Sequence, residues 1–182
     1  MIHGKLINLR AVKQSDLDEL IVLQSDVVER GEFLNPNIVN EVLFKKNYQE
    51  TGFMNEEFGR LLITDKNGKL LGDIAYFKGV GYLPGYEIGY NMFKREDRGK
   101  GYTSEALKLF AAYLFEVKTI HRLEVHADKD NIGSRRVAEK SGFTFEGIKR
   151  QAVFSRGKYC DLAIYSLLRD ECPSFTEMIK DK

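Results

Sequence analysis

Residues 93–110 read FKREDRGKGYTSEALKLF and place two glycines, Gly99 and Gly101, directly before a strongly patterned helix. Glycine lets a backbone adopt unusual torsion angles and approach a ligand closely. The first N–H groups of a helix have no partner within the helix, so they point at whatever lies in front of it. This turn is therefore a candidate cradle for a pyrophosphate. The residues involved are Arg98, Gly99, Lys100, Gly101, Tyr102 and Thr103.

Two common phosphate motifs do not fit this turn. The P-loop needs Ser or Thr after Gly99-Lys100, where Gly101 stands, and the dinucleotide motif needs a third glycine where Ser104 stands. The alternative is an ordinary strand-to-helix turn. In that case Gly101 supplies a positive φ, and Thr103 or Ser104 is the N-cap.

Composition predicts one globular domain over residues 1–182. The chain is 43% apolar and 30% charged and can bury a real core. The net charge of +1 provides no strong attraction to nucleic acid or to an anionic membrane. The start of the chain has no signal-peptide pattern, and no window approaches the roughly 18 apolar residues of a membrane span. Cys160 and Cys172 form no CxxC motif, which indicates a reducing compartment. We expect a cytoplasmic protein.

Hydrophobic periodicity predicts alternating strands and helices. The helix over 103–118 has the clearest apolar face, and Ser15 is the expected N-cap of an earlier helix. Residues 30–58 are expected to form a short helix and loops. The predicted fold class is α/β with a mixed sheet. The expected strands cover residues 5–12, 60–64, 69–77, 86–93, 122–127, 143–154 and 161–168, and a last helix covers 131–141.

A second motif lies thirty residues after the glycine turn. Residues 127–143 read ADKDNIGSRRVAEKSGF, where a strand ends and Asn131 opens a helix that contains Ser134. Taken alone, Asn131 is an N-cap and Ser134 a solvent-facing residue. The order strand–RGKG–helix–strand–NxxS–helix–GF, however, resembles the GCN5-related N-acetyltransferase (GNAT) superfamily. The resemblance is closest to its ribosomal-protein-alanine acetyltransferase (RimJ/RimL-like) branch and runs from NLRAV to DLAIYSLLRDE.

The resemblance implies the GNAT fold, a splayed mixed sheet of six to seven strands with helices on both faces. It also implies acetyl-CoA as cosubstrate. The turn Arg98 to Thr103 would bind its pyrophosphate, and backbone groups near Met92 and Phe93 would pair with the pantetheine. The Phe93 amide would face the thioester oxygen. Asn131 would bond the pantetheine side, and Ser134 would lie near the sulfur.

The chain departs from the family pattern at three positions. Glu96 stands where Gln or Arg is common, three residues before the first glycine. Ala138 stands where many members have a Tyr that protonates the leaving thiolate, so we name Ser134 as the substitute. Val153 stands where the ribosomal-protein L12 enzymes have Glu, which weakens the case for that substrate.

The expected chemistry is attack of a neutral amine on a thioester. At pH 7 deprotonation costs about 1.4 kcal/mol for an α-amine and about 4.6 kcal/mol for a lysine-like amine. Glu87 is the candidate base, with a surface carboxylate in a cross-strand pair as the alternative. His121 and His126 lack the spacing of catalytic or metal-binding residues, and no metal motif occurs. Four tyrosines are either acceptor-pocket or core residues: Tyr82, Tyr86, Tyr90 and Tyr159.

Two functions follow from these patterns. The first is an acetyltransferase acting on a primary amine of a protein N-terminus or a small molecule. The second is a catalytically weak acetyl-CoA-binding sensor or scaffold, suggested by Ala138 and the uncertain base. Residues 30–58 and the 79–85 loop are expected to shape the acceptor pocket. Relatives are often homodimers, and we extend that expectation to this chain by analogy alone.

Overall fold

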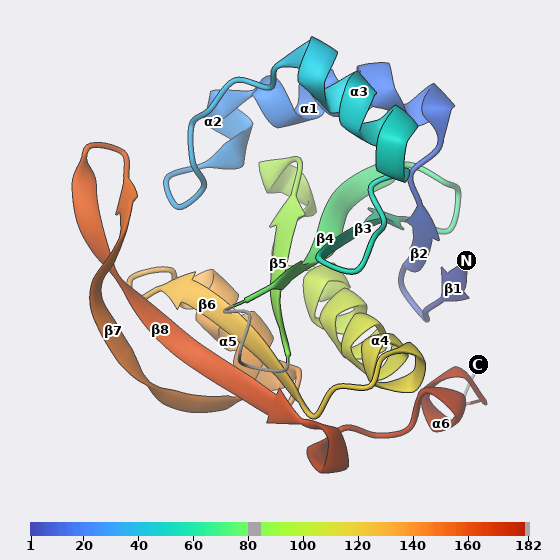
Figure 1. Ribbon diagram of the computed structural model, residues 1–182, viewed down its shortest axis with the longest axis vertical. Helices are drawn as coiled ribbons and strands as arrows, with labels where there is room; N and C mark the ends of the chain where they lie inside the picture. Colours follow the sequence, from blue (N-terminus) through green and yellow to red (C-terminus); the bar gives the residue numbers. More distant parts are fainter. Residues whose placement is uncertain (80–84, 181–182) are drawn as a thin grey trace.

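Eight strands form one sheet in the computed structural model, which describes residues 1–79 and 85–180. Their order is β1-β2-β3-β4-β5-β6-β8-β7 (Figure 1). The mixed sheet is as predicted. It has one strand more than expected, because Ile2–His3 pairs with the next strand as a short edge. The strands are β1 Ile2–His3, β2 Asn8–Ala11, β3 Phe58–Thr64, β4 Leu70–Lys78, β5 Tyr86–Met92, β6 Arg122–Asp128, β7 Thr144–Ser155 and β8 Lys158–Leu168.

Helices cover both faces of this sheet. In Figure 1, α1, α2 and α3 gather on one side, and α4 lies on the other. The described helices are α1 Leu17–Ser25, α2 Val27–Arg30, α3 Glu41–Thr51, α4 Tyr102–Val117, α5 Ile132–Lys140 and α6 Phe175–Lys180. The prediction of Ser15 as an N-cap is wrong. A 3-10 turn over Gln14–Asp16 precedes α1, and the Asp16 carboxylate accepts the Lys13 N–H at 2.7 Å.

The sheet opens between β5 and β6. This is the parallel pair in the sheet, and helix α4 makes the crossover that such a pair requires. Pairing between the two strands is limited to Tyr86 with Leu123 and Glu87 with Glu124. Beyond Glu87 the strands diverge, so one edge of β5 faces an opening and no longer a neighbouring strand.

Helix α4 closes one side of this opening. Its apolar stripe lies against the sheet residues Ile74, Tyr76 and Ile88, all nearly inaccessible to solvent. Its end is held by Arg169, whose guanidinium donates to three carbonyl groups of the helix end and the segment after it. The packing and the Arg169 hydrogen bonds together hold α4, and with it the start of the helix, in place against the sheet. The buried stripe consists of Ala106, Leu107, Leu109, Phe110, Ala111, Ala112, Leu114 and Phe115.

Glu105 in the first turn of α4 ties the N-terminal segment to this helix. Its carboxylate accepts the N–H groups of Lys5 at 2.5 Å, Leu6 at 2.8 Å and Ile7 at 3.0 Å. Hydrogen bonds to a charged group contribute about 1.5–3 kcal/mol each, and they contribute less where the pair is exposed to solvent, as the bonds to Lys5 and Leu6 are. We expect Glu105→Ala to lower the free energy of unfolding by about 2 kcal/mol, measured by urea denaturation. Glu116→Ala, at an exposed position on the same helix, is the control, and equal losses would contradict the prediction.

Candidate functional site

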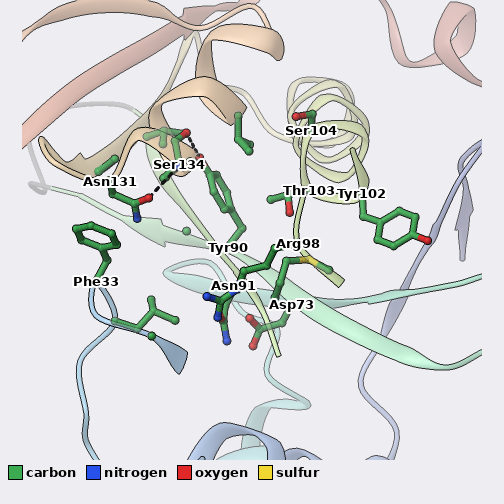
Figure 2. A pocket seen from close by; sticks show the side chains of 18 of the residues that line it. Phe33, Asp73, Tyr90, Asn91, Arg98, Tyr102, Thr103, Ser104, Asn131 and Ser134 are labelled. Atoms are coloured by element: carbon green, nitrogen blue, oxygen red, sulfur yellow. Dashed lines mark hydrogen bonds between the residues drawn. The ribbon is translucent and has the colours of Figure 1, made fainter. Parts of the chain in front are cut away.

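A cleft of about 1200 Å³ occupies the opening between β5 and β6. The cleft has two halves, the α4–α5 half and the α1–α2 half, each bordered by the helices of its name. The α4–α5 half is lined by the glycine turn, Thr103, Ser104, Asn131 and Ser134. The α1–α2 half is lined by Gln24, Arg30, Phe33, Arg60 and Asp73. Figure 2 looks into this cleft.

The glycine turn presents main-chain donors to the cleft. Gly99 and Gly101 have φ of 76° and 85°, and Gly101 is the N-cap of α4, so Thr103 and Ser104 do not cap it. Among the described residues, no protein acceptor bonds the amides from Gly99 to Thr103. The Arg98 amide differs, because it donates to the Arg95 carbonyl at 3.1 Å. The predicted row of amides is therefore one residue shorter than expected.

The basic side chains of this turn are partly engaged by protein groups. The Arg98 guanidinium donates to the carbonyl of Glu29 near the end of α2. Part of its hydrogen-bonding capacity is therefore used within the protein and is not reserved for a pyrophosphate. Lys100 and Lys69 both bond the Asp97 carboxylate, at 3.3 and 3.0 Å. Burial acts to raise the pKa of Asp97, but these two bonds outweigh it and lower the pKa. Asp97 thus stays ionised and reduces the positive charge beside the turn.

Two further basic residues line the same half of the cleft. Arg136 and Lys140 are exposed residues of α5, four positions apart and so on one helix face. The sequence analysis did not name these two residues, although their spacing of four positions in a predicted helix indicates a common face. Glu96, the unfavourable carboxylate of the motif, has a side chain 69% exposed and lies 3.7 Å from Lys69. It does not line the cleft.

The main-chain groups that face the cleft at the end of β5 are only partly the predicted ones. The Phe93 N–H donates to the Leu71 carbonyl of β4 at 2.9 Å, and the Phe93 side chain is buried. The predicted role of this amide at the thioester is therefore wrong. Backbone groups of successive residues in a strand point to opposite edges, so Tyr90 and Met92 turn theirs away from β4 and toward the opening. Met92 remains a candidate, and Tyr90 joins it.

Ser134 brings a hydroxyl group to the α4–α5 half of the cleft. Asn131 is the N-cap of α5, and its Oδ1 accepts the Ser134 N–H at 3.0 Å. The Tyr90 hydroxyl lies 3.0 Å from the Ser134 Oγ and donates to the Ser134 carbonyl at 3.0 Å (Figure 2). Burial raises the pKa of Tyr90 to about 12. Tyr90 is thus a neutral phenol that fixes Ser134, a contact that the sequence did not reveal.

The other predicted tyrosines do not line the cleft where they can be placed. The Tyr86 hydroxyl donates to the Glu56 carbonyl at 2.8 Å from a buried position, as a core residue does. Tyr159 is 67% exposed on the β7–β8 hairpin. Tyr82 and most of the predicted 79–85 loop lie outside the described residues. In Figure 2 the Tyr102 ring also points away from Ser134.

Glu87 pairs with a histidine and is absent from the cleft lining. Its Oε2 lies 3.1 Å from the His126 Nδ1, and the His126 Nε2 lies 2.8 Å from the Glu124 Oε2. His126 does line the cleft. Burial acts to lower the pKa of His126, but the carboxylates of Glu87 and Glu124 outweigh it and raise the pKa. The cross-strand alternative for Glu87 therefore describes its surroundings better than a base in contact with substrate.

We expect an NMR titration to give His126 a pKa above its ordinary 6.5, because two carboxylates face the ring. A raised folded-state pKa stabilises the fold fully below about pH 6.5, and this contribution disappears as pH rises through the folded-state value. Glu87→Gln should bring the pKa of His126 back down. Glu57→Gln is the control at an exposed position. An unchanged His126 titration in Glu87→Gln would refute the assigned pair.

The α1–α2 half holds a polar cluster that the sequence did not predict. Asp73 on β4 accepts from the Gln24 Nε2 at 3.3 Å and lies 3.5 Å from the Arg60 Nε. Arg30 donates to the Gln24 carbonyl at 2.7 Å. Burial raises the pKa of Asp73, although Arg60 and Arg30 act to lower it. This cluster brings together α1, α2, β3 and β4.

None of the helices in residues 1–79 and 85–180 has the length and apolar character of a membrane span. In the same residues no group of three or more His, Cys, Asp or Glu side chains is placed to hold a metal ion.

Comparison with known proteins identifies the family. The acetyltransferase (GNAT) domain family model matches residues 7–144. The probable N-acetyltransferase YjcK of Bacillus subtilis (strain 168) is 31% identical over 179 residues, covering 94% of this chain and 98% of its own length.

Two solved structures share the fold. The spermidine N-acetyltransferase from Vibrio cholerae, in complex with CoA and spermine, has a TM-score of 0.79 at 20% identity, covering 92% of this chain and 98% of its own. RimL, a ribosomal L7/L12 alpha-N-protein acetyltransferase in complex with coenzyme A, has a TM-score of 0.80 at 22% identity, covering 92% and 97%. With the family match, these confirm the predicted fold class and superfamily. The chain belongs to the GNAT family and is an acetyltransferase.

Proposed function

We propose that this enzyme transfers the acetyl group of acetyl-CoA to a primary amine by direct attack. The observation that carries the proposal is the row of amides from Gly99 to Thr103, which have no protein acceptor among the described residues and stand at the start of α4. A helix start with such donors binds phosphate groups well. The two solved relatives named above are complexes with CoA, which supports the same donor here.

The donor would lie along the α4–α5 half of the cleft. The amides from Gly99 to Thr103 bind the pyrophosphate, and Lys100, Arg136 and Lys140 add positive charge around it. The pantetheine pairs with the edge of β5 that has no neighbouring strand, through the backbone of Tyr90 and Met92. The Asn131 side-chain amide keeps its N–H groups for the pantetheine, because only its Oδ1 is used in capping α5.

The reaction forms a C–N bond and breaks the C–S bond of the thioester. The amine nitrogen attacks the carbonyl carbon, and the carbonyl oxygen gains negative charge, which a β5 main-chain N–H of Tyr90 or Met92 stabilises. As the intermediate collapses, the sulfur leaves with the electron pair of the C–S bond. Ser134 gives its hydroxyl proton to that sulfur and regains a proton from water in the cleft, while the Tyr90 hydroxyl, 3.0 Å from the Ser134 Oγ, holds the serine in place. The proton that the attacking nitrogen loses goes to solvent, so the products are the amide and CoA as a thiol.

The proton of the acceptor ammonium must leave before this attack. Glu87 is a predicted base that we do not place in contact with the amine, because it pairs with His126 and does not line the cleft. We propose that the charge of the α1–α2 half favours the neutral amine directly, as a cationic neighbourhood lowers the pKa of an ammonium group.

The test is calorimetric titration with acetyl-CoA, followed by a thiol-release assay with a broad panel of amines. We expect saturable binding and turnover with at least one amine. Absence of binding at millimolar acetyl-CoA would refute the proposal. Tight binding without turnover on any amine would instead favour the sensor or scaffold function.

A further inference from the structure

The α1–α2 half of the cleft has more guanidinium groups than buried carboxylates. Arg30 and Arg60 line the cleft there, and Asp73 is the buried carboxylate between them. A third guanidinium, that of Arg156 on the β7–β8 hairpin, is close enough to repel Arg30 and donates to the Gly31 carbonyl at 2.5 Å. Burial, together with this repulsion and that of Arg60, lowers the pKa of Arg30 against the opposing effect of Asp73. One buried carboxylate therefore faces several cations, and the other carboxylate that lines this half, Glu32, is exposed to solvent.

Arg60 is held by aromatic rings more than by hydrogen bonds. Its guanidinium carbon lies 5.8, 5.3 and 5.7 Å from the ring centroids of Phe44, Phe53 and Phe58. Rings stack on the faces of a guanidinium group and leave its edges for acceptors. The Arg60 Nε and Nη1 nevertheless have no hydrogen-bond partner among the described residues. The Asp73 oxygen, 3.5 Å away, is near enough for an ion pair but is not aligned as an acceptor.

Arg30 shows the same shortage of acceptors. Its Nη1 donates to the Gln24 carbonyl at 2.7 Å, but its buried Nε has no partner in residues 1–79 and 85–180. Each guanidinium group has five N–H donors, and donors left without acceptors in a buried site are costly. Arg30 on α2 and Arg60 on β3 both line the cleft, and each has at least one buried N–H group without an acceptor among the described residues. An anion in the α1–α2 half would supply the missing acceptors and balance the charge.

We infer that the acceptor amine carries a carboxylate group, and that the Arg30 and Arg60 side chains bind this carboxylate in the α1–α2 half. This inference rests on the proposed function, since it names the substrate class of the same cleft. Arginine suits the role because its planar N–H edge matches two carboxylate oxygens. The acceptor is thus of the amino-acid type, with its amine directed toward the thioester and its carboxylate toward α2.

The same charges disfavour a polyamine. The relative from Vibrio cholerae is a spermidine N-acetyltransferase that was solved with spermine bound. A polycation in this chain would place further positive charge beside Arg30 and Arg60, which costs free energy in a partly buried site. An acceptor that carries a carboxylate instead brings a negative charge to Arg30 and Arg60, so the same positive field favours its binding.

The experiment compares amines that differ only in the carboxylate. L-lysine is paired with cadaverine and L-phenylalanine with phenethylamine, and spermidine is added as a polycation, all assayed by thiol release at saturating acetyl-CoA. We expect the carboxylate-bearing member to have at least about tenfold higher kcat/KM in one or both pairs. Arg60→Gln and Arg30→Gln should bring that ratio close to one. Arg150→Gln, at an exposed position on β7, should leave it unchanged.

A second readout needs no variant and no turnover. With CoA present, N-acetyl-L-phenylalanine should raise the melting temperature of the wild-type enzyme, and N-acetylphenethylamine should not. A preference for the decarboxylated amines or spermidine would overturn the inference while leaving the proposed function intact. A ratio unaffected by either arginine variant would overturn it too. The inference would also be overturned if neither pair of amines were turned over and N-acetyl-L-phenylalanine did not raise the melting temperature. Failure to bind acetyl-CoA would instead refute the proposed function.

Discussion

Valine in place of Gly99 is expected to weaken acetyl-CoA binding by about 10- to 100-fold while leaving the protein folded. Gly99 has φ of 76°, in the region that β-branched residues rarely adopt, and a Cβ built there meets no heavy atom within 4 Å. The substitution therefore causes no clash in the free protein. The valine variant relaxes to negative φ and turns neighbouring amides away from the phosphate. Binding must then restore the left-handed conformation at about 1–2 kcal/mol or lose a charge-assisted hydrogen bond of about 1.5–3 kcal/mol.

Gly68→Val is the matched control for this prediction. Gly68 has φ of 91° in the turn between β3 and β4, and a Cβ there also meets nothing within 4 Å. The control introduces the same kind of backbone strain at a position that does not line the cleft, so it should lower stability without changing the dissociation constant. Calorimetric titration of both variants with acetyl-CoA makes the comparison. Equal affinities for the two variants would mean that the glycine turn does not bind the coenzyme.

The local elements of the fold were predictable because their signals lie within short windows. The apolar spacing of residues 103–118 predicted α4 to within a residue at each end, and the hairpin of β3 and β4 followed from two largely apolar runs on either side of a turn. The prediction failed at Ser15, since a 3-10 turn and the Asp16 carboxylate organise that corner. The two-residue strand β1 is too short to carry a pattern.

The site was predictable where a motif is contiguous and not where distant segments meet. The glycine turn and the Asn131 to Ser134 motif each lie in one stretch of chain. The orientation of the Phe93 amide depends on the register of β4 with β5, which no window around Phe93 contains. The cluster of Arg30, Arg60 and Asp73 comes from three segments that no short window of sequence joins. The sequence indicates the cluster only through Arg60 and Asp73, which are charged residues within the largely apolar strands over 58–64 and 70–78.

Alanine in place of Ser134 is expected to reduce kcat about 100-fold at pH 7, with little change in acetyl-CoA affinity. A positioned acid contributes typically 10²–10⁴-fold, and a leaving thiol with pKa of about 8.5 needs help at the low end of that range. The defect should shrink as pH rises above about 8.5, because a thiolate is then stable without a proton. Pre-steady-state rates over this pH range measure it. A defect of constant size across that range would rule out proton donation by Ser134.

Tyr90→Phe tests whether the phenol and Ser134 act as one unit. The variant keeps the ring but removes the hydroxyl that lies 3.0 Å from the Ser134 Oγ. It should lower kcat about tenfold alone and add little to Ser134→Ala, because residues that work through one another are not additive. Tyr159→Phe, at an exposed hydroxyl on the hairpin, is the control. If the kcat losses of Tyr90→Phe and Ser134→Ala multiply in the double variant, Tyr90 serves catalysis by some route other than Ser134.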